Sequence, residues 1–196
     1  MKNIKKIKDN ITEKEFRFLI NFINADTSIR ANRRDRLIKL FHLLYYTGLR
    51  INETTSLTNR QIKELLQEKK TKIIAHKQRL EKYIFITEKS KKVLEKLFDD
   101  IIDDDNYIFT SERGNKNRPL NPNSVIRDVN SYLKQVFQSK NITSHSFRQT
   151  IITEMAAHNI NTKIIQNLIG HKSISSTYRY IRPSESDLIN SLDLVR

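Results

Sequence analysis

Residues 36–53 read RLIKLFHLLYYTGLRINE, and this stretch sets the expectation for the fold. Its apolar residues recur at i, i+3, i+4, i+7 and i+8, the spacing of one face of an α-helix: Leu37, Leu40, Phe41, Leu44 and Tyr45. Thr47 and Gly48 end this helix, because glycine favours the position just past a helix C-terminus. A short helix follows from about Ile51 to Leu57. The stretch therefore predicts a helical core.

Helical signals continue on both sides. Residues typical of helix caps predict five more helix starts, at Thr12, Thr87, Asn121, Ser144 and Asn161. Thr12 forms a T-x-x-E capping box with Glu15, and Pro122 follows Asn121 as the first helical residue. Gly170 is expected to end the last of these helices.

The apolar period changes between about residues 72 and 87. Short β-prone runs at 73–75 and 83–86 flank the charged segment 77–81. This pattern predicts a β-hairpin or a small antiparallel sheet. The expected fold class is therefore mainly α with a small antiparallel β-sheet (α+β). A length of 196 residues fits one full domain or at most two small ones. We expect a basic arm over residues 1–10, a single domain over 11–183 and a tail helix over 184–196.

Charge is the main compositional signal. The chain has 36 Lys and Arg against 22 Asp and Glu, a net charge of +14. Such a surplus favours a polyanionic partner, and nucleic acid is the first candidate; a solvated basic surface is the alternative, and an anionic membrane surface is weaker. The absence of cysteine excludes disulfides, thiolate zinc sites and cysteine nucleophiles. No apolar run approaches the ~18 residues of a membrane span, and no signal-peptide core is present, so we expect a cytoplasmic protein.

A few polar residues stand at unusual positions. Arg50 lies just past a predicted helix end, and His145 and Arg148 are spaced i, i+3 on one predicted helix face. His171 directly follows a predicted helix stop, and Tyr180 lies nine residues beyond it. Taken singly, each has an ordinary interpretation, because a lone arginine is usually a surface charge and a lone tyrosine usually packs.

The ordered set is more specific. TGLRINE at 47–53, HSFR at 145–148 and LIGH at 168–171, with a tyrosine at 180, follow one another in the chain. In this order they resemble the catalytic domain of the tyrosine recombinases, the phage integrase family, over about residues 11–183. The resemblance implies a site-specific DNA recombinase that cuts and rejoins strands through a 3′-phosphotyrosyl intermediate. It leaves open whether the role is integration, inversion or dimer resolution.

The resemblance also implies the roles of five side chains. Tyr180 would be the nucleophile that attacks the phosphodiester. Arg50 and Arg148 would bind its nonbridging oxygens, as permanently charged guanidiniums do well. His145 would accept the tyrosine proton or position the phosphate, and His171 would donate a further hydrogen bond. No metal or other cofactor is implied.

Several assignments stay open at this point. Lys77, in the predicted hairpin, would protonate the leaving 5′-oxygen, with Lys72 and Lys82 as alternatives. Tyr178 competes with Tyr180 for the role of nucleophile, although Tyr180 has the family spacing. Glu53 would orient Arg50, or it is an ordinary surface carboxylate.

The resemblance implies double-stranded DNA as partner, a homotetramer on DNA and association with the nucleoid. We expect the apolar tail to dock on a neighbouring subunit. The catalytic-type pattern begins within the first fifteen residues, so we expect no N-terminal core-binding domain of the kind that most family members carry. An accessory protein is then a candidate partner. Two other functions remain: a DNA-binding module of the same fold with weak or no catalysis, and a DNA-relaxing enzyme of related topoisomerase chemistry.

Overall fold

A computed structural model describes residues 8–75, 80–102, 104–111, 117–178, 180–181, 189 and 191–193. The chain forms two compact units, residues 1–150 and 151–196. Within the described residues helices dominate, and β-structure forms a two-stranded antiparallel sheet. The expected class, mainly α with a small antiparallel sheet, is confirmed. The division into an arm, a domain over 11–183 and a tail stays a prediction.

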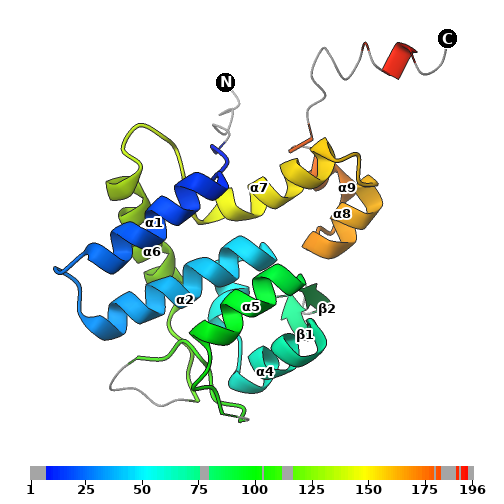
Figure 1. The fold of residues 1–196 in the computed structure, drawn as a ribbon. Helices are drawn as coiled ribbons and strands as arrows, with labels where there is room; N and C mark the ends of the chain where they lie inside the picture. Colours follow the sequence, from blue (N-terminus) through cyan, green and yellow to red (C-terminus); the bar gives the residue numbers. More distant parts are fainter. Residues whose placement is uncertain are drawn as a thin grey trace. The chain divides into compact units, whose positions relative to one another are not determined.

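Figure 1 shows the elements of the first unit and labels most of them. In chain order they are α1 (Glu13–Ala25), α2 (Ala31–Thr47), α3 (Ile51–Thr55), α4 (Asn59–Glu68), β1 (Lys70–Ala75), β2 (Leu80–Phe85), α5 (Glu88–Leu97), α6 (Pro122–Val136) and the first half of α7 (Ser144–Ala157).

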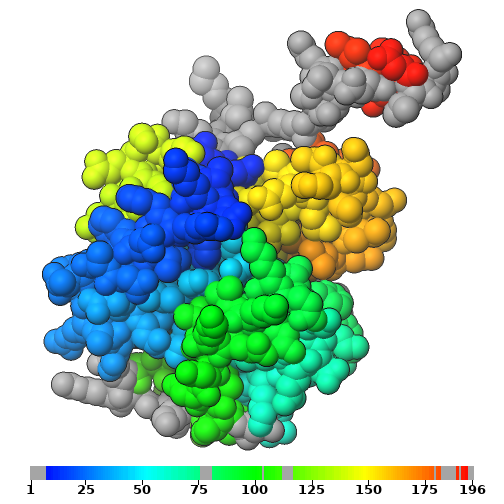
Figure 2. Space-filling model, viewed as in Figure 1, coloured from blue at the N-terminus to red at the C-terminus, as the bar shows by residue number. Residues whose placement is uncertain are grey.

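Helix α2 lies at the centre of the first unit. Its buried apolar residues are Leu37, Leu40, Phe41, Leu43 and Leu44. Helices α1, α3 and α5 all pack on it, and Figure 1 shows it between α1 and α5. In Figure 2 the side chains of α1 and α2 fill the space between their ribbons. Each fully buried side chain of this kind contributes about 1.5–3 kcal/mol. The stretch that predicts the fold is thus the one around which the unit packs.

Most predicted helix boundaries are confirmed. Thr12 and Glu15 form the expected capping box, and Asn121 accepts hydrogen bonds from the first turn of α6. The cap prediction at Ser144 is off by one position, since α7 begins at Ser144 itself. Gly48 adopts a left-handed conformation at the end of α2, with φ 62°.

Helix α4 is an element that the predicted helices do not include. Thr58 and Gln61 form a capping box in which each side chain accepts from the other residue's backbone N–H. Ile62, Leu65 and Leu66 are buried at helical spacing. The signal was therefore present in the sequence, as T-x-x-Q ahead of an apolar pattern. Helix α4 packs on β1 and helps to cover the inner face of the sheet.

The predicted hairpin is confirmed as β1 and β2. Its antiparallel register places Ile73 opposite Lys82 and Lys72 opposite Tyr83. Side chains alternate along β1, so that Ile73 is buried and Lys72 is exposed. Lys82 shares the inner face with Ile73 because cross-strand partners lie on the same side of a sheet. Residues 76–79, and Lys77 among them, lie outside the described residues.

The second unit contains the end of α7 with α8 (Thr162–Ile169) and α9 (Ile174–Tyr178). Ile152, Ile165 and Ile169 form its small core. As predicted, Asn161 caps α8 and Gly170 ends it, with φ 70°. The expected tail helix over 184–196 lies outside the described residues except for 189 and 191–193. Among the described helices, none has the length and apolar character needed to cross a membrane.

Two helix ends allow a test of backbone strain. Gly48 and Lys69 both close a helix with positive φ, 62° and 57°. A side chain with Cβ is disfavoured there. We expect Gly48→Ala to lower the free energy of unfolding by about 1 kcal/mol, measured by urea denaturation. Lys69→Gly relieves the same conformation, so it should not destabilise. A Gly48→Ala variant as stable as the parent would contradict this reading of the turn.

Candidate active site

Glu53 is buried beneath Arg50 at the start of α3. Glu53 as a whole residue is only 3% exposed. Its Oε2 accepts the backbone N–H of Arg50 at 3.0 Å, and its Oε1 accepts from the Arg50 guanidinium at 3.1 Å. The left-handed Gly48 turns the chain just before this point, so that Arg50 becomes the N-cap of α3. Glu53 therefore holds both the backbone and the side chain of Arg50, and it is not a surface carboxylate.

Lys82 reaches the same carboxylate from β2. Its Nζ donates to Glu53 Oε2 at 3.0 Å, and its side chain is 10% exposed. Burial lowers the pKa of the Lys82 ammonium, and the charges of Arg148 and Arg50 act in the same direction, against the attraction of Glu53. Burial alone would raise the pKa of Glu53, but Lys82, the Arg50 N–H and Arg148 outweigh burial and hold that pKa below its usual value. Glu53 is thus a carboxylate at neutral pH.

Arg148 completes this cluster from α7. It is 5% exposed, and its Nη1 donates to the Gly48 carbonyl at 2.8 Å. The arginine of the H-x-x-R motif is therefore fixed to the turn that precedes Arg50. The structure brings together three cations and one carboxylate, Arg50, Lys82, Arg148 and Glu53, which leaves a net charge of two positive. We call this group the cationic cluster.

The other candidates of the first unit are placed differently. His145 is exposed on the first turn of α7, whereas Arg148, three residues later, is buried. Lys77 lies outside the described residues, so its role stays a prediction. Of the two alternatives to Lys77, Lys72 is on the exposed face of the hairpin and pairs with Glu81 at 2.9 Å.

The second unit brings His171 and Tyr180 together. Their rings stack with centroids 6.1 Å apart and an interplanar angle of 25°. His171 Nδ1 also lies 3.0 Å from the Thr177 hydroxyl. Tyr180 packs partly buried against the small core of this unit, whereas Tyr178 is 53% exposed. The contact with His171 therefore distinguishes Tyr180 from Tyr178.

Two contacts of these groups were not foreseen from the sequence. The sequence offers Lys82 as a candidate proton donor, but nothing in it predicts the pairing with Glu53 across 29 positions. The alternation of the strand did indicate that Lys82 shares a face with buried residues. Thr177 lies between two motifs and carried no signal of its own.

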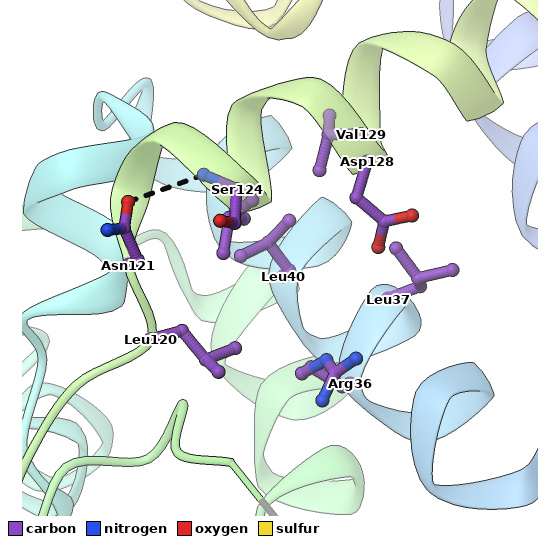
Figure 3. Close-up of a pocket in the computed structure, with 9 residues that line it drawn as sticks. Arg36, Leu37, Leu40, Leu120, Asn121, Ser124, Asp128 and Val129 are labelled. Atoms are coloured by element: carbon purple, nitrogen blue, oxygen red, sulfur yellow. Dashed lines mark hydrogen bonds between the residues drawn. The ribbon is translucent and has the colours of Figure 1, made fainter.

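Two hollows of the first unit lie away from the cationic cluster. One of about 260 Å³ opens between α2 and α6 and is lined by Leu37, Leu40, Leu120, Val125 and Val129 with four polar residues (Figure 3). Another, of about 430 Å³, lies among α1, α2 and α5. Neither is lined by a residue of the cationic cluster. Among the described residues, no group of three or more His, Asp or Glu side chains is placed to hold a metal ion.

The buried pair of Lys82 and Glu53 generates a stability prediction. Lys82→Met leaves a buried carboxylate with one cation fewer, and we expect a loss of about 3 kcal/mol in urea unfolding. Adding Glu53→Gln should restore much of that loss, because the uncompensated charge is then gone. Lys72→Met is the control: it breaks an exposed pair on the same hairpin and should cost about 1 kcal/mol or less. The loss of unfolding free energy is also measured for Glu53→Gln alone. If the Lys82→Met/Glu53→Gln double variant loses the full sum of its two single losses, Lys82 and Glu53 are not coupled.

Named relatives align with most of the length of this chain. It is 30% identical over 190 residues to the tyrosine recombinase XerA of Pyrococcus horikoshii, covering 96% of this chain and 62% of the relative. It is 26% identical over 187 residues to the tyrosine recombinase XerC of Leptospira interrogans, covering 94% and 58%. The chain thus spans about three-fifths of the length of these curated relatives.

Solved structures show the same fold. The crystal structure of XerA recombinase superposes with a TM-score of 0.69 at 24% identity, covering 95% of this chain and 65% of that one. The Tn1549 transposon integrase in complex with circular intermediate DNA gives a TM-score of 0.74 at 18% identity, covering 100% and 70%. The model of the family described as "Phage integrase family" matches residues 9–187. Since that match spans nearly the whole chain, the chain belongs to the phage integrase family.

Proposed function

We propose that this chain cuts and rejoins DNA strands as the catalytic part of a tyrosine-type site-specific recombinase. The observation that carries the proposal is the stacking of Tyr180 on His171, which pairs the expected nucleophile with an imidazole. Family membership and the relatives named as tyrosine recombinases support it.

The proposed reaction needs only the chain's own residues. The Tyr180 hydroxyl attacks the phosphorus and loses its proton to His145 as the base. The bond from phosphorus to the 5′-oxygen breaks, and Lys77 protonates that oxygen. The DNA is left with a 3′-phosphotyrosyl link and a free 5′-hydroxyl. Attack by a 5′-hydroxyl of another strand reverses these steps and releases Tyr180.

Negative charge on the phosphate oxygens is the main obstacle in this reaction. Arg50 and Arg148 stay protonated throughout, and donors fixed in advance stabilise developing charge with little reorganisation. The net positive charge of the cationic cluster supports this role. The Glu53 carboxylate accepts a hydrogen bond from the Arg50 guanidinium, and the Gly48 carbonyl accepts one from the buried Arg148. We assign His171 a further hydrogen bond to the same phosphate.

Double-stranded DNA is the proposed substrate. The net charge of +14 supports it, as do solved relatives described as bound to DNA, among them the XerH recombinase on its difH substrate. We further propose that the chain assembles as a homotetramer on DNA through the tail at 184–196, and that an accessory protein takes part. We also propose association with the nucleoid and a role on a mobile element. DNA binding without strand exchange is the outcome that would favour the alternative function.

The nucleophile is tested by covalent trapping. The full chain is incubated with a pool of nicked duplexes of randomised sequence, denatured, and the DNA that stays attached is recovered. We expect an adduct that peptide mapping places on Tyr180. Tyr180→Phe removes one hydroxyl, so it should abolish the adduct while DNA affinity changes little. Arg50→Ala or Arg148→Ala should slow cleavage by roughly 10²–10³.

Two controls separate the alternatives. Tyr178→Phe removes a hydroxyl from the exposed neighbour and should leave the adduct intact. Chelator should not prevent cleavage, since no metal has a role in the proposed steps. An adduct on Tyr178 would show the wrong nucleophile, and an adduct that survives Tyr180→Phe but disappears with chelator would overturn the mechanism.

DNA affinity should depend steeply on salt. Each phosphate contact contributes a slope of about −0.9 to log K against log salt, because the protein releases condensed cations from DNA. Fluorescence anisotropy with a labelled duplex at increasing potassium chloride measures this slope. An affinity that hardly changes with salt would contradict binding through the basic surface.

A further inference from the structure

Thr177 makes hydrogen bonds with both candidate site residues of the second unit, His171 and Tyr180. It is fully buried, at 0% exposure, in α9. Its hydroxyl oxygen lies 3.0 Å from His171 Nδ1. Its backbone carbonyl accepts the N–H of Tyr180 at 3.0 Å. One buried residue thus contacts the imidazole through its side chain and the tyrosine through its backbone.

The backbone of His171 is already fixed. Its N–H donates to the Gln166 carbonyl at 3.1 Å, and its own carbonyl accepts from Gln166 Nε2 at 3.0 Å. The left-handed Gly170 makes this reversal at the end of α8 possible. With the backbone held, the orientation of the ring depends on its two side-chain torsions. The contact with Thr177 and the stacking on Tyr180 both contribute to that orientation.

The contact also has a consequence for the proton of the ring. A neutral imidazole carries one N–H, and the hydrogen bond at one nitrogen selects which nitrogen has it. A hydroxyl that donates to Nδ1 places the proton on Nε2. The ring is then a hydrogen-bond donor through Nε2, which is the form that a phosphate oxygen requires.

We propose that Thr177 is a positioning residue, whose hydroxyl donates to His171 Nδ1 and so presents Nε2–H to the phosphate while its carbonyl holds the backbone of Tyr180. This inference rests on the proposed function for the identity of the phosphate ligand. The state of the His171 ring is a property of the protein alone.

The matched variants separate the hydroxyl from packing. Thr177→Val keeps the branched shape and removes the hydroxyl. Thr177→Ser keeps the hydroxyl and removes the methyl group. Ser175→Ala is the control, because it removes an exposed hydroxyl of the same helix whose partner is Ser173 and not His171. Urea unfolding of each variant confirms that it is folded before any other measurement.

The first readout needs no DNA. In protein labelled with ¹⁵N-histidine, at mildly alkaline pH where the imidazole is neutral, the His171 signal is assigned by its loss in His171→Gln. We expect nitrogen shifts of the Nε2–H form in the parent and in Thr177→Ser, and a mixture of the two forms in Thr177→Val. Nitrogen shifts that do not differ between the parent and Thr177→Val would overturn the proposal.

The second readout is the rate of covalent cleavage of a nicked duplex recovered by the trapping experiment. Thr177→Val should slow the step about fivefold to tenfold, as expected for one neutral hydrogen bond, and Thr177→Ser should cleave at nearly the parent rate. In a His171→Ala background, Thr177→Val should have no further effect, because it acts through His171. An equal further loss there would contradict the positioning role. If adducts form without Tyr180, the proposed function fails, and the nitrogen shifts still decide the role of Thr177.

Discussion

A buried carboxylate is the constraint on which the first unit depends. Glu53 is almost completely removed from solvent, and an ionised carboxylate in such a place requires cations and N–H donors around it. It has both, from the start of α3 and from the inner face of β2. The hairpin and the helix turn after α2 are thereby tied to one point by charge as well as by apolar packing.

The pairing of Lys82 with Glu53 explains why the site has a net positive charge although it contains a carboxylate. Lys82 balances Glu53 from within, so the carboxylate does not neutralise the charge of Arg50 alone. The guanidinium of Arg148 donates to the Gly48 carbonyl, which is a neutral acceptor. A surface ion pair is screened by solvent and salt, whereas the carboxylate of this group is 1% exposed and the Lys82 side chain 10% exposed. Fixed cations of this kind suit a reaction in which charge develops on phosphate oxygens.

The contacts in the second unit are of a different kind, because amide and hydroxyl groups surround its histidine. A histidine and a tyrosine nine positions apart are brought into contact by one glycine turn and one short helix. Gln166 fixes the histidine backbone, and Thr177 contacts its ring. These contacts involve an amide, a hydroxyl and an imidazole, whereas the charged groups proposed for the reaction are the arginines and the lysine.

Local patterns in the sequence determined the helices around residues 36–53, the caps at Thr12, Asn121 and Asn161, and the hairpin, because these features depend on neighbours within a few positions. The motif order also indicated the family and favoured Tyr180 over Tyr178. The pairing of Lys82 with Glu53, the bond from Arg148 to Gly48 and the contact of Thr177 with His171 were decided by the tertiary structure. The first two join residues 29 and 100 positions apart. No periodicity links such residues, and only the packing of strands and helices determines which polar groups are buried side by side.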